Sequence, residues 1–385
     1  MAGLAAHSAN DALSVVRAYL FRKQIYGWSG GVYTAHQIPI ILAMTTAPTA
    51  TPGHSATPRA LSASEKWGPS EWFGNPILGV TKAERLHLAQ DALLPAADAN
   101  RPCPHLTALT GLDWRCSKPG GLCAVQRYAR NGAGGVSLTG DQVAICPSRI
   151  VSKAVLGAIA KTVLGPTVDA VLVKEVPYSV SLTKTLKNGE PASAGRIDWL
   201  LVDVANPKRF CAVETQSVYM SGKTQDTTFQ AFVDAMGDMA MPPLYRHPDY
   251  KSSVPKRLAP QLESKARHLS STSRKTVVLV DEFVRANMSL LHEVPVPAAY
   301  SADPEKAAKH KLNSCEVVFA IVSLSGGSLA VTEYLYCSIE AARAALNAVA
   351  AMSHADFESV VQSLVAPVDN KGLPKPWRAG KVFTL

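Results

Sequence analysis

The sequence predicts a mixed fold of the α/β or α+β class, on three observations. Apolar residues make up 47% of the 385 residues, which is enough for a sizeable folded core. Several short apolar runs have the length of buried strands. Other segments place their apolar residues three and four positions apart, the spacing of one helix face.

Residues 1–65 differ in composition from the rest of the chain. Residues 45–63 (TTAPTATPGHSATPRALSA) are rich in Thr, Ala, Pro and Ser and have almost no large apolar residues. That composition favours neither helix nor strand and is typical of a linker. We therefore expect residues 1–65 to be a flexible extension that the chemistry does not need, with Met44 as an alternative start. The folded part should begin near Trp67.

The first predicted elements lead to a hairpin. Residues 152–163 have helical spacing of their apolar side chains, and residues 168–180 contain apolar runs of strand length. Residues 197–204 and 210–218 predict two paired strands, because Asn206-Pro207 between them is a turn signal.

The remaining elements complete the mixed pattern. The predicted helices cover residues 227–241 and 338–351, and the predicted strands cover residues 276–280, 317–324 and 329–336, the last two turned through Gly326-Gly327. A basic stretch with Pro and Ser, residues 251–275, lies between the first of these helices and the first of these strands.

Four cysteines lie close together at Cys103, Cys116, Cys123 and Cys146, separated by 12, 6 and 22 residues. Prolines follow the first and last of them, and Pro-Gly-Gly stands just before the third, so the chain can bend sharply there. Four thiolates complete a tetrahedral shell for a soft or borderline metal, which indicates a structural site for iron or zinc.

The cysteine spacing leaves an alternative, because it is not that of a zinc finger with paired CxxC motifs. Under this alternative the four cysteines are unrelated buried thiols. We interpret Cys211, Cys315 and Cys337, which lie in apolar strands, as small core residues.

Polar side chains interrupt the predicted hairpin at Asp198, Glu214 and Gln216. Strand side chains alternate between faces, so Glu214 and Gln216 should project together, about 7 Å apart. Asp198 should start the partner strand, which the turn brings alongside. Two carboxylates suit Mg²⁺, which activates an attacking water and neutralises charge on a scissile phosphate. Asp198 and Glu214 could instead be ordinary exposed strand residues, and Asp281-Glu282 is a rival pair that we interpret as a strand end.

The charge balance favours a polyanionic partner. Lys and Arg number 39 against 30 Asp and Glu, a formal charge of +9, and nucleic acid is the usual partner of such proteins. A mildly basic soluble enzyme is the alternative. The seven cysteines at uneven spacing, with no recognisable secretion signal, favour a cytoplasmic location. We expect no membrane association, because no apolar stretch is long enough to span a bilayer.

Residues 72–232 resemble the NotI restriction endonuclease family. The resemblance is carried by CPHLTAL at Cys103, the Cys116 and Cys123 pair with its Gly-rich approach, ICPSR at Cys146, Asp198-Trp199, and VETQ at residues 213–216 followed by Ser221-Gly222. The order, the spacing and the neighbouring residues all agree with the family.

The resemblance implies a PD-(D/E)xK core, in which helices flank a mixed sheet, and a lobe whose four cysteines bind one iron. It implies Asp198 and Glu214 as Mg²⁺ ligands and places Gln216, instead of the usual Lys, near the attacking water. An amide can orient water but cannot act as a base. The family has a further acid upstream of the Asp, for which Glu175 and Glu190 are the candidates.

The predicted function is that of a type II restriction endonuclease, which hydrolyses double-stranded DNA at a specific, GC-rich palindrome with Mg²⁺. A palindrome predicts a homodimer. Residues 66–150 would form a lobe with the cysteine site, and residues 151–385 a nuclease core with DNA-binding elements. Candidate DNA contacts are Arg127, Arg130, Arg149 and residues 251–275, or these are solvated surface charges. The rival functions are a non-specific or repair nuclease with the same metal site, and a cysteine-metal DNA-binding regulator without cleavage activity.

Overall fold

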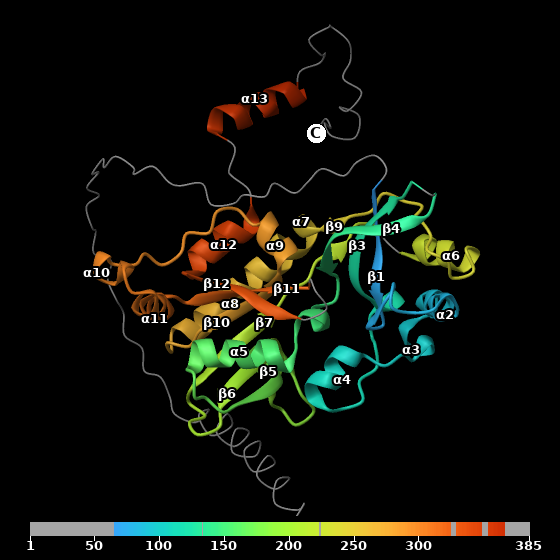
Figure 1. Ribbon diagram of the computed structural model, residues 1–385. Coiled ribbons are helices and arrows are strands. Elements are labelled where there is room, and N and C mark those ends of the chain that lie inside the picture. Colours follow the sequence, from blue (N-terminus) through green and yellow to red (C-terminus); the bar gives the residue numbers. More distant parts are fainter. Residues whose placement is uncertain (1–64, 133, 223–224, 325–328, 349–352, 366–385) are drawn as a thin grey trace, which may run out of the picture. The chain divides into compact units, whose positions relative to one another are not determined.

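The computed structural model describes residues 65–132, 134–222, 225–324, 329–348 and 353–365 (Figure 1). The predicted extension, apart from its last residue, and the predicted turn at Gly326-Gly327 lie outside these residues. The chain divides into two units, residues 1–347 and 348–385. Helix α13 (His354–Val365) is the described element of the second unit, and everything below concerns the first.

The bounds of the elements are as follows. The strands are β1 (Lys66–Trp72), β2 (Asn75–Pro76), β3 (Leu122–Arg130), β4 (Val136–Ala144), β5 (Ala170–Thr185), β6 (Pro191–Asp203), β7 (Phe210–Thr215), β8 (Tyr219–Met220), β9 (Pro248–Asp249), β10 (Thr276–Asp281), β11 (Val317–Ser323) and β12 (Ala330–Cys337). The helices are α2 (Lys82–Ala92), α3 (Ala96–Ala99), α4 (Pro104–Thr110), η1 (Pro119–Gly121), η2 (Pro147–Ile150), α5 (Lys153–Leu164), α6 (Asp226–Asp234), α7 (Tyr250–Ser253), η3 (Val254–Leu258), α8 (Ala259–Ser270), α9 (Glu282–Asn287), α10 (Ala298–Ser301), α11 (Pro304–Ser314) and α12 (Ile339–Asn347).

A six-stranded sheet forms the centre of the first unit, in the order β12-β11-β10-β7-β6-β5. Strands β7, β10 and β11 are parallel, whereas β5, β6 and β12 pair antiparallel with their neighbours. The sheet is therefore mixed, and the predicted combination of strands and helices is confirmed. The predicted hairpin is confirmed too, because β6 pairs antiparallel with β7 and Arg209 donates its N–H to the carbonyl of Asn206 (2.8 Å) in the turn.

Helices cover both faces of this sheet (Figure 1). Strand β10 shows why: Val277 and Leu279 pack in one apolar cluster with α5, whereas Val278 and Val280 pack in another with α8 and α12. The alternation of side chains along a strand buries both faces of a central strand, which gives the continuous apolar runs seen in the sequence. Helix α5 begins where predicted, because Ser152 caps it by accepting the N–H of Val155 (3.2 Å).

A second, antiparallel sheet has the order β2-β1-β3-β4 and carries the cysteine region. Its Trp67, Trp72 and Tyr128 pack in the same apolar cluster as Phe319 of the central sheet. Residues from the predicted lobe (66–150) and from the predicted nuclease core (151–385) therefore pack in one hydrophobic core. Asp281 adds a polar link, because its Oδ2 accepts the N–H of Ala144 (2.8 Å) at the end of β4.

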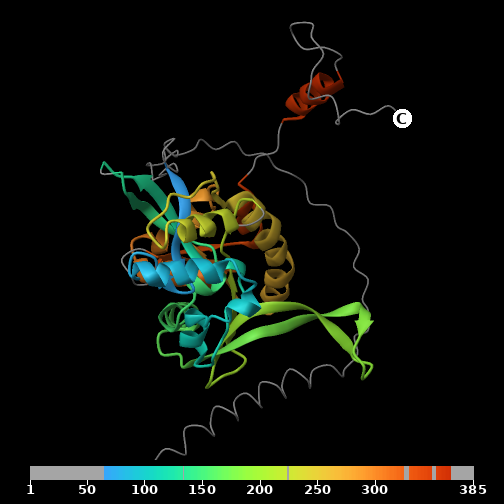
Figure 2. The same ribbon diagram turned by 90° about the vertical axis from the view of Figure 1, so that its right-hand side faces the viewer.

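Several predicted bounds were wrong. Strand β6 begins at residue 191 instead of 197, because its partner β5 continues far beyond the central sheet as a two-stranded ribbon (Figure 2). Helix α6 ends at Asp234 instead of 241, where Met236 and Gly237 adopt positive φ angles of 50° and 82°. Strand β7 ends at Thr215 instead of 218. The basic stretch 251–275 folds mostly into the consecutive helices α7, η3 and α8.

Candidate active site and metal centre

Asp198 lies in the middle of β6, so its predicted place at the start of the strand was wrong. Thr215 on the neighbouring strand β7 donates its backbone N–H (3.0 Å) and its hydroxyl (2.9 Å) to Oδ2 of Asp198. Trp199 is opposite Val213 in the register of the two strands, which puts Asp198 next to Glu214. The structure thus brings the two predicted carboxylates together.

Glu214 is only 1% exposed and has one charged partner. Its Oε2 accepts from Nζ of Lys265 on α8 at 2.7 Å, whereas its Oε1 is buried with no hydrogen-bond partner. Burial raises the pKa of Glu214 to about 7, the charge of Asp198 adds to the rise, and Lys265 opposes it. A buried carboxylate with an unpartnered oxygen fits a cation-binding role, because a buried polar atom without a partner costs about 1–3 kcal/mol.

Gln216 follows directly after β7. Its backbone N–H donates to the carbonyl of Leu279 (3.1 Å), and its side-chain amide donates to the carbonyl of Ser217. Within the described part of the chain, no hydrogen bond joins Gln216 to Asp198 or Glu214. The strand was predicted to carry Glu214 and Gln216 on one face. In the structure it ends at Thr215, and Gln216 forms hydrogen bonds with nearby backbone instead.

A pocket of about 200 Å³ opens beside Asp198. Its other lining residues include Thr215, Glu175 and Ser148. Glu175 has a φ of 53°, an unusual backbone conformation for a residue with a side chain, and Arg196 holds its Oε2 at 3.0 Å. Glu190, in contrast, lies in the turn at the far end of the β5–β6 ribbon, where its carbonyl accepts the N–H of Leu186. Of the two upstream acids, Glu175 is the one at the site.

The four cysteines line one small cavity of about 10 Å³. Neighbouring backbones hold them there: Cys146 donates its N–H to the carbonyl of Cys123 (3.2 Å), and Cys103 and Cys116 bond to the carbonyls of Trp114 and Arg101. All four are free thiols. Cys211, Cys315 and Cys337 are buried in the core, as predicted.

The surroundings of the cavity fit a thiolate shell for a metal. Burial raises the pKa values of Cys103, Cys116 and Cys123, so thiolates there require compensation by a cation. Gly74 donates its N–H to Sγ of Cys123 at 3.3 Å, and the N–H groups of His105 and Leu106 donate to Cys103. Among the described residues, however, no three of these four sulfur atoms lie within 4.8 Å of one another, so a closed tetrathiolate shell for iron or zinc would require them to move closer.

Glu71 links two of the cysteine segments, because it bonds to one residue near Cys103 and to another near Cys146. Its two oxygens accept from Nε2 of His105 (2.7 Å) and Nε of Arg149 (2.6 Å), and the three side chains are largely buried. Glu71, His105 and Cys123 are the residues whose ligand atoms lie within 4.8 Å of one another in the described part of the chain, but both carboxylate oxygens of Glu71 already accept hydrogen bonds. Arg149 is therefore a structural partner of Glu71 whose side chain is 15% exposed, and its role as a DNA contact stays a prediction.

The family model for Restriction endonuclease NotI matches residues 89–302, which is more than half of the chain and spans both the cysteines and the hairpin. This chain belongs to the NotI restriction endonuclease family. The restriction endonucleases are hydrolases that act on DNA, so this membership also indicates the class of substrate. None of the curated proteins compared with the chain matches it. No helix in the described segments is both long enough and apolar enough to cross a bilayer.

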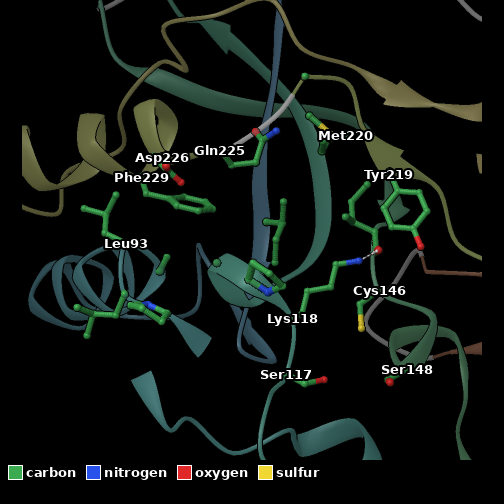
Figure 3. Close-up of a pocket in the computed structure, with 18 of the residues that line it drawn as sticks. Leu93, Ser117, Lys118, Cys146, Ser148, Tyr219, Met220, Gln225, Asp226 and Phe229 are labelled. Carbon is green, nitrogen blue, oxygen red and sulfur yellow. Dashed lines mark hydrogen bonds between the residues drawn. The ribbon is translucent and has the colours of Figure 1, made fainter. Parts of the chain in front are cut away.

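A larger pocket of this NotI-family chain, about 860 Å³, adjoins the cysteines (Figure 3). Lys118, Cys146 and Tyr219 lie on one side of it, and Phe229 and Leu93 on the other. The Lys118 ammonium lies 5.1 Å from the ring centre of Tyr219, and Arg257 lies over the same ring at 4.4 Å. Pro147 and Ser148 line both this pocket and the one beside Asp198, so the two pockets share a wall.

Lys265 is the site residue that the sequence reasoning missed in this family member. It belongs to the basic stretch, but 51 positions separate it from Glu214, so no local motif connects the two. One signal was available: Lys265 stands among Leu262, Ala266 and Leu269 on the apolar face of α8. A lone charge on such a face indicates a buried partner.

Replacing Lys265 with Met should destabilise the metal-free protein by about 3–5 kcal/mol, because Glu214 is then buried without its counter-charge. The double variant Lys265→Met/Glu214→Gln should recover most of this loss. Urea unfolding at pH 8 with a chelator measures both, and Lys306→Met on the exposed helix α11 is the control. Equal stability of Lys265→Met and the wild type would show that the ion pair contributes nothing.

Proposed function

We propose that this NotI-family chain is a type II restriction endonuclease that cuts double-stranded DNA at a specific GC-rich palindrome with the help of Mg²⁺. The observation that carries the proposal is the adjacency of Asp198 and Glu214 on strands β6 and β7, with an unpartnered buried oxygen on Glu214. The GC-rich palindrome follows from the family resemblance alone.

The arrangement around these acids supports a PD-(D/E)xK core. Helix α5 is followed by the antiparallel strands β5, β6 and β7, and α8 then leads to β10, which is parallel to β7. Helices therefore flank a mixed sheet, and the two acids occupy adjacent strands near its edge.

Asp198 and Glu214 would hold the Mg²⁺, with Glu175 as the additional acid. A bound Mg²⁺ supplies a water of lowered pKa and positive charge against the scissile phosphate. The residues of the chain prepare for this: Thr215 fixes the carboxylate of Asp198, and Lys265 holds that of Glu214. Lys265 also provides the positive charge that Gln216 lacks. Gln216 would orient water through its amide.

Cys103, Cys116, Cys123 and Cys146 would hold a structural iron or zinc. A closed shell of four thiolates leaves no open position for hydrolysis, so its role is to shape the surface. Cys146 stands directly before Pro147 and Ser148, which form the shared wall of the two pockets. The metal would thereby position the surface that the DNA follows from Asp198 to Lys118.

A palindromic site has two-fold symmetry, so we propose a homodimer with one active site for each strand. Arg130, Lys251 and Lys256 are exposed and remain candidates for phosphate contacts. Arg127 is less available, because Glu65 lies 3.9 Å from it and the ring of Trp67 lies beneath it.

Digestion of a fully sequenced phage DNA with Mg²⁺ tests the proposal. We expect a small set of fragments whose sequenced ends all fall at one palindrome, and no cutting in a chelator. Ragged ends would favour a non-specific or repair nuclease. Binding without any cutting would favour a regulator.

A further inference from the structure

The ribbon formed by residues 177–196 is the distal part of the β5–β6 hairpin, and it leaves the central sheet (Figure 2). None of its residues is buried, yet its two strands stay paired as far as Thr185 and Pro191. A two-stranded ribbon without a core of its own is marginally stable in water. Such an element normally has a partner to lie against.

The side chains of the ribbon are suited to a polyanion. Lys184, Lys187 and Arg196 give it three positive charges against the single acid Glu190, a net charge of +2. Most of its other polar residues carry hydroxyl groups: Tyr178, Ser179, Ser181, Thr183, Thr185 and Ser193. Leu182 is 99% exposed, and Val180 and Leu186 are exposed as well. Lys and hydroxyl side chains are typical donors to phosphate oxygens.

The root of the ribbon is fixed beside the candidate active site. Its two strands are the direct continuations of those that carry Glu175 and Asp198. Tyr178 bonds to Ser264 (3.1 Å) on α8, the helix that also carries Lys265. At roughly 3.3 Å per residue, the seven positions from Asp198 to Pro191 span about 23 Å, which corresponds to about seven base pairs of B-DNA.

We propose that this ribbon is a DNA arm, which enters the major groove of the duplex whose backbone lies at Asp198 and Glu214. The inference rests on the proposed function and identifies the surface that grips the substrate. The major groove, about 12 Å wide, admits a two-stranded ribbon. Lys184 and Lys187 would contact phosphates, and Leu182 would make apolar contact with base edges on the groove floor.

A second copy of the chain is a poorer fit for the ribbon. A stable protein interface buries about 800 Å² on each partner and has an apolar centre. The ribbon offers only Val180, Leu182 and Leu186 as large aliphatic side chains, spread along one strand and its turn and separated by polar residues. Its positive charges would also repel the same ribbon of a second copy.

The test is binding of a random-sequence 40-base-pair duplex by the full chain without divalent ions, measured over a range of salt concentrations. In Lys184→Ser/Lys187→Ser, the slope of log affinity against log salt should become shallower by about 1.8, or about 0.9 for each lost phosphate contact. The control is Lys306→Ser/Lys309→Ser, which removes the same charge from α11. This helix contacts β12, the edge strand of the central sheet opposite β5.

The outcomes separate the arm from the proposed function. A slope that changes in the ribbon variant and not in the control supports the arm. If the wild type binds the duplex and the ribbon variant and the control both keep the wild-type slope, the arm is overturned and the nuclease proposal stands. A ribbon variant that sediments as a monomer where the wild type is a dimer would assign the ribbon to a second copy. If the wild type fails to bind the duplex at all, the proposed function falls, and the arm with it.

Discussion

Asp198→Asn should abolish DNA cleavage and leave DNA binding intact. The amide keeps the size of the side chain and can still meet the Thr215 hydroxyl, but it removes the charge that a Mg²⁺ ligand needs. A bound Mg²⁺ would contribute several kcal/mol of transition-state stabilisation, so under the proposed function the cleavage rate should fall by at least about 1,000-fold. Rates on a plasmid that the wild type cuts, together with duplex binding by the same samples, measure the two effects separately.

A second active-site variant and a control variant test the same prediction. Glu214→Gln should give the same loss of cleavage, because the second carboxylate is equally required. Asp238→Asn is the matched control: it removes an exposed acid four residues after the end of α6, where it pairs with Lys82 at 2.6 Å. Cleavage by Asp198→Asn at the wild-type rate would remove Asp198 from the reaction.

If the four cysteines hold iron or zinc as proposed, Cys116→Ser should lose this metal and melt at a temperature lower by at least about 10 °C. The free energy of metal binding to thiolate sites, on the order of 10 kcal/mol, adds to that of folding, and a hydroxyl replaces a thiolate poorly. Elemental analysis of the purified protein measures the metal and distinguishes iron from zinc. Thermal unfolding measures the stability.

Cys337→Ala is the control for the cysteine prediction, because Cys337 is a buried core thiol at the end of β12. It should retain its metal, although the small cavity costs some stability. Unchanged metal content in Cys116→Ser would mean that the four cysteines do not form one shell.

Local patterns in the sequence were enough to predict the central elements. The hairpin followed from alternation and from one turn, and both are properties of adjacent residues. The predicted grouping of the four cysteines is confirmed, since they line one cavity, whereas the metal that they would bind stays a prediction. The predicted neighbourhood of Asp198 and Glu214 matches the strand register, since pairing across a short turn leaves few choices.

Features that depend on distant contacts could not be predicted in this way. Lys265 reaches Glu214 from another helix, and Arg149 is withdrawn from solvent by Glu71, which is 78 positions away. In the ribbon, Tyr178, Val180 and Leu182 alternate with hydroxyl residues over residues 178–183, but none of them is buried, so this short alternation did not reveal how far beyond residue 180 the strand pair extends. The position of Gln216 was set by a carbonyl of its own neighbour, an interaction without a sequence signature.

The shared wall at Pro147 and Ser148 would give the proposed cysteine metal site a second role besides stabilising the fold. Under the proposed function, an oxidant or chelator that displaced Cys146 would also shift the next two residues, where the DNA would lie. Such an enzyme would lose its grip on DNA while its central sheet was still intact. Oxidation of the cysteine sulfurs would thus inactivate the nuclease without unfolding of its central sheet.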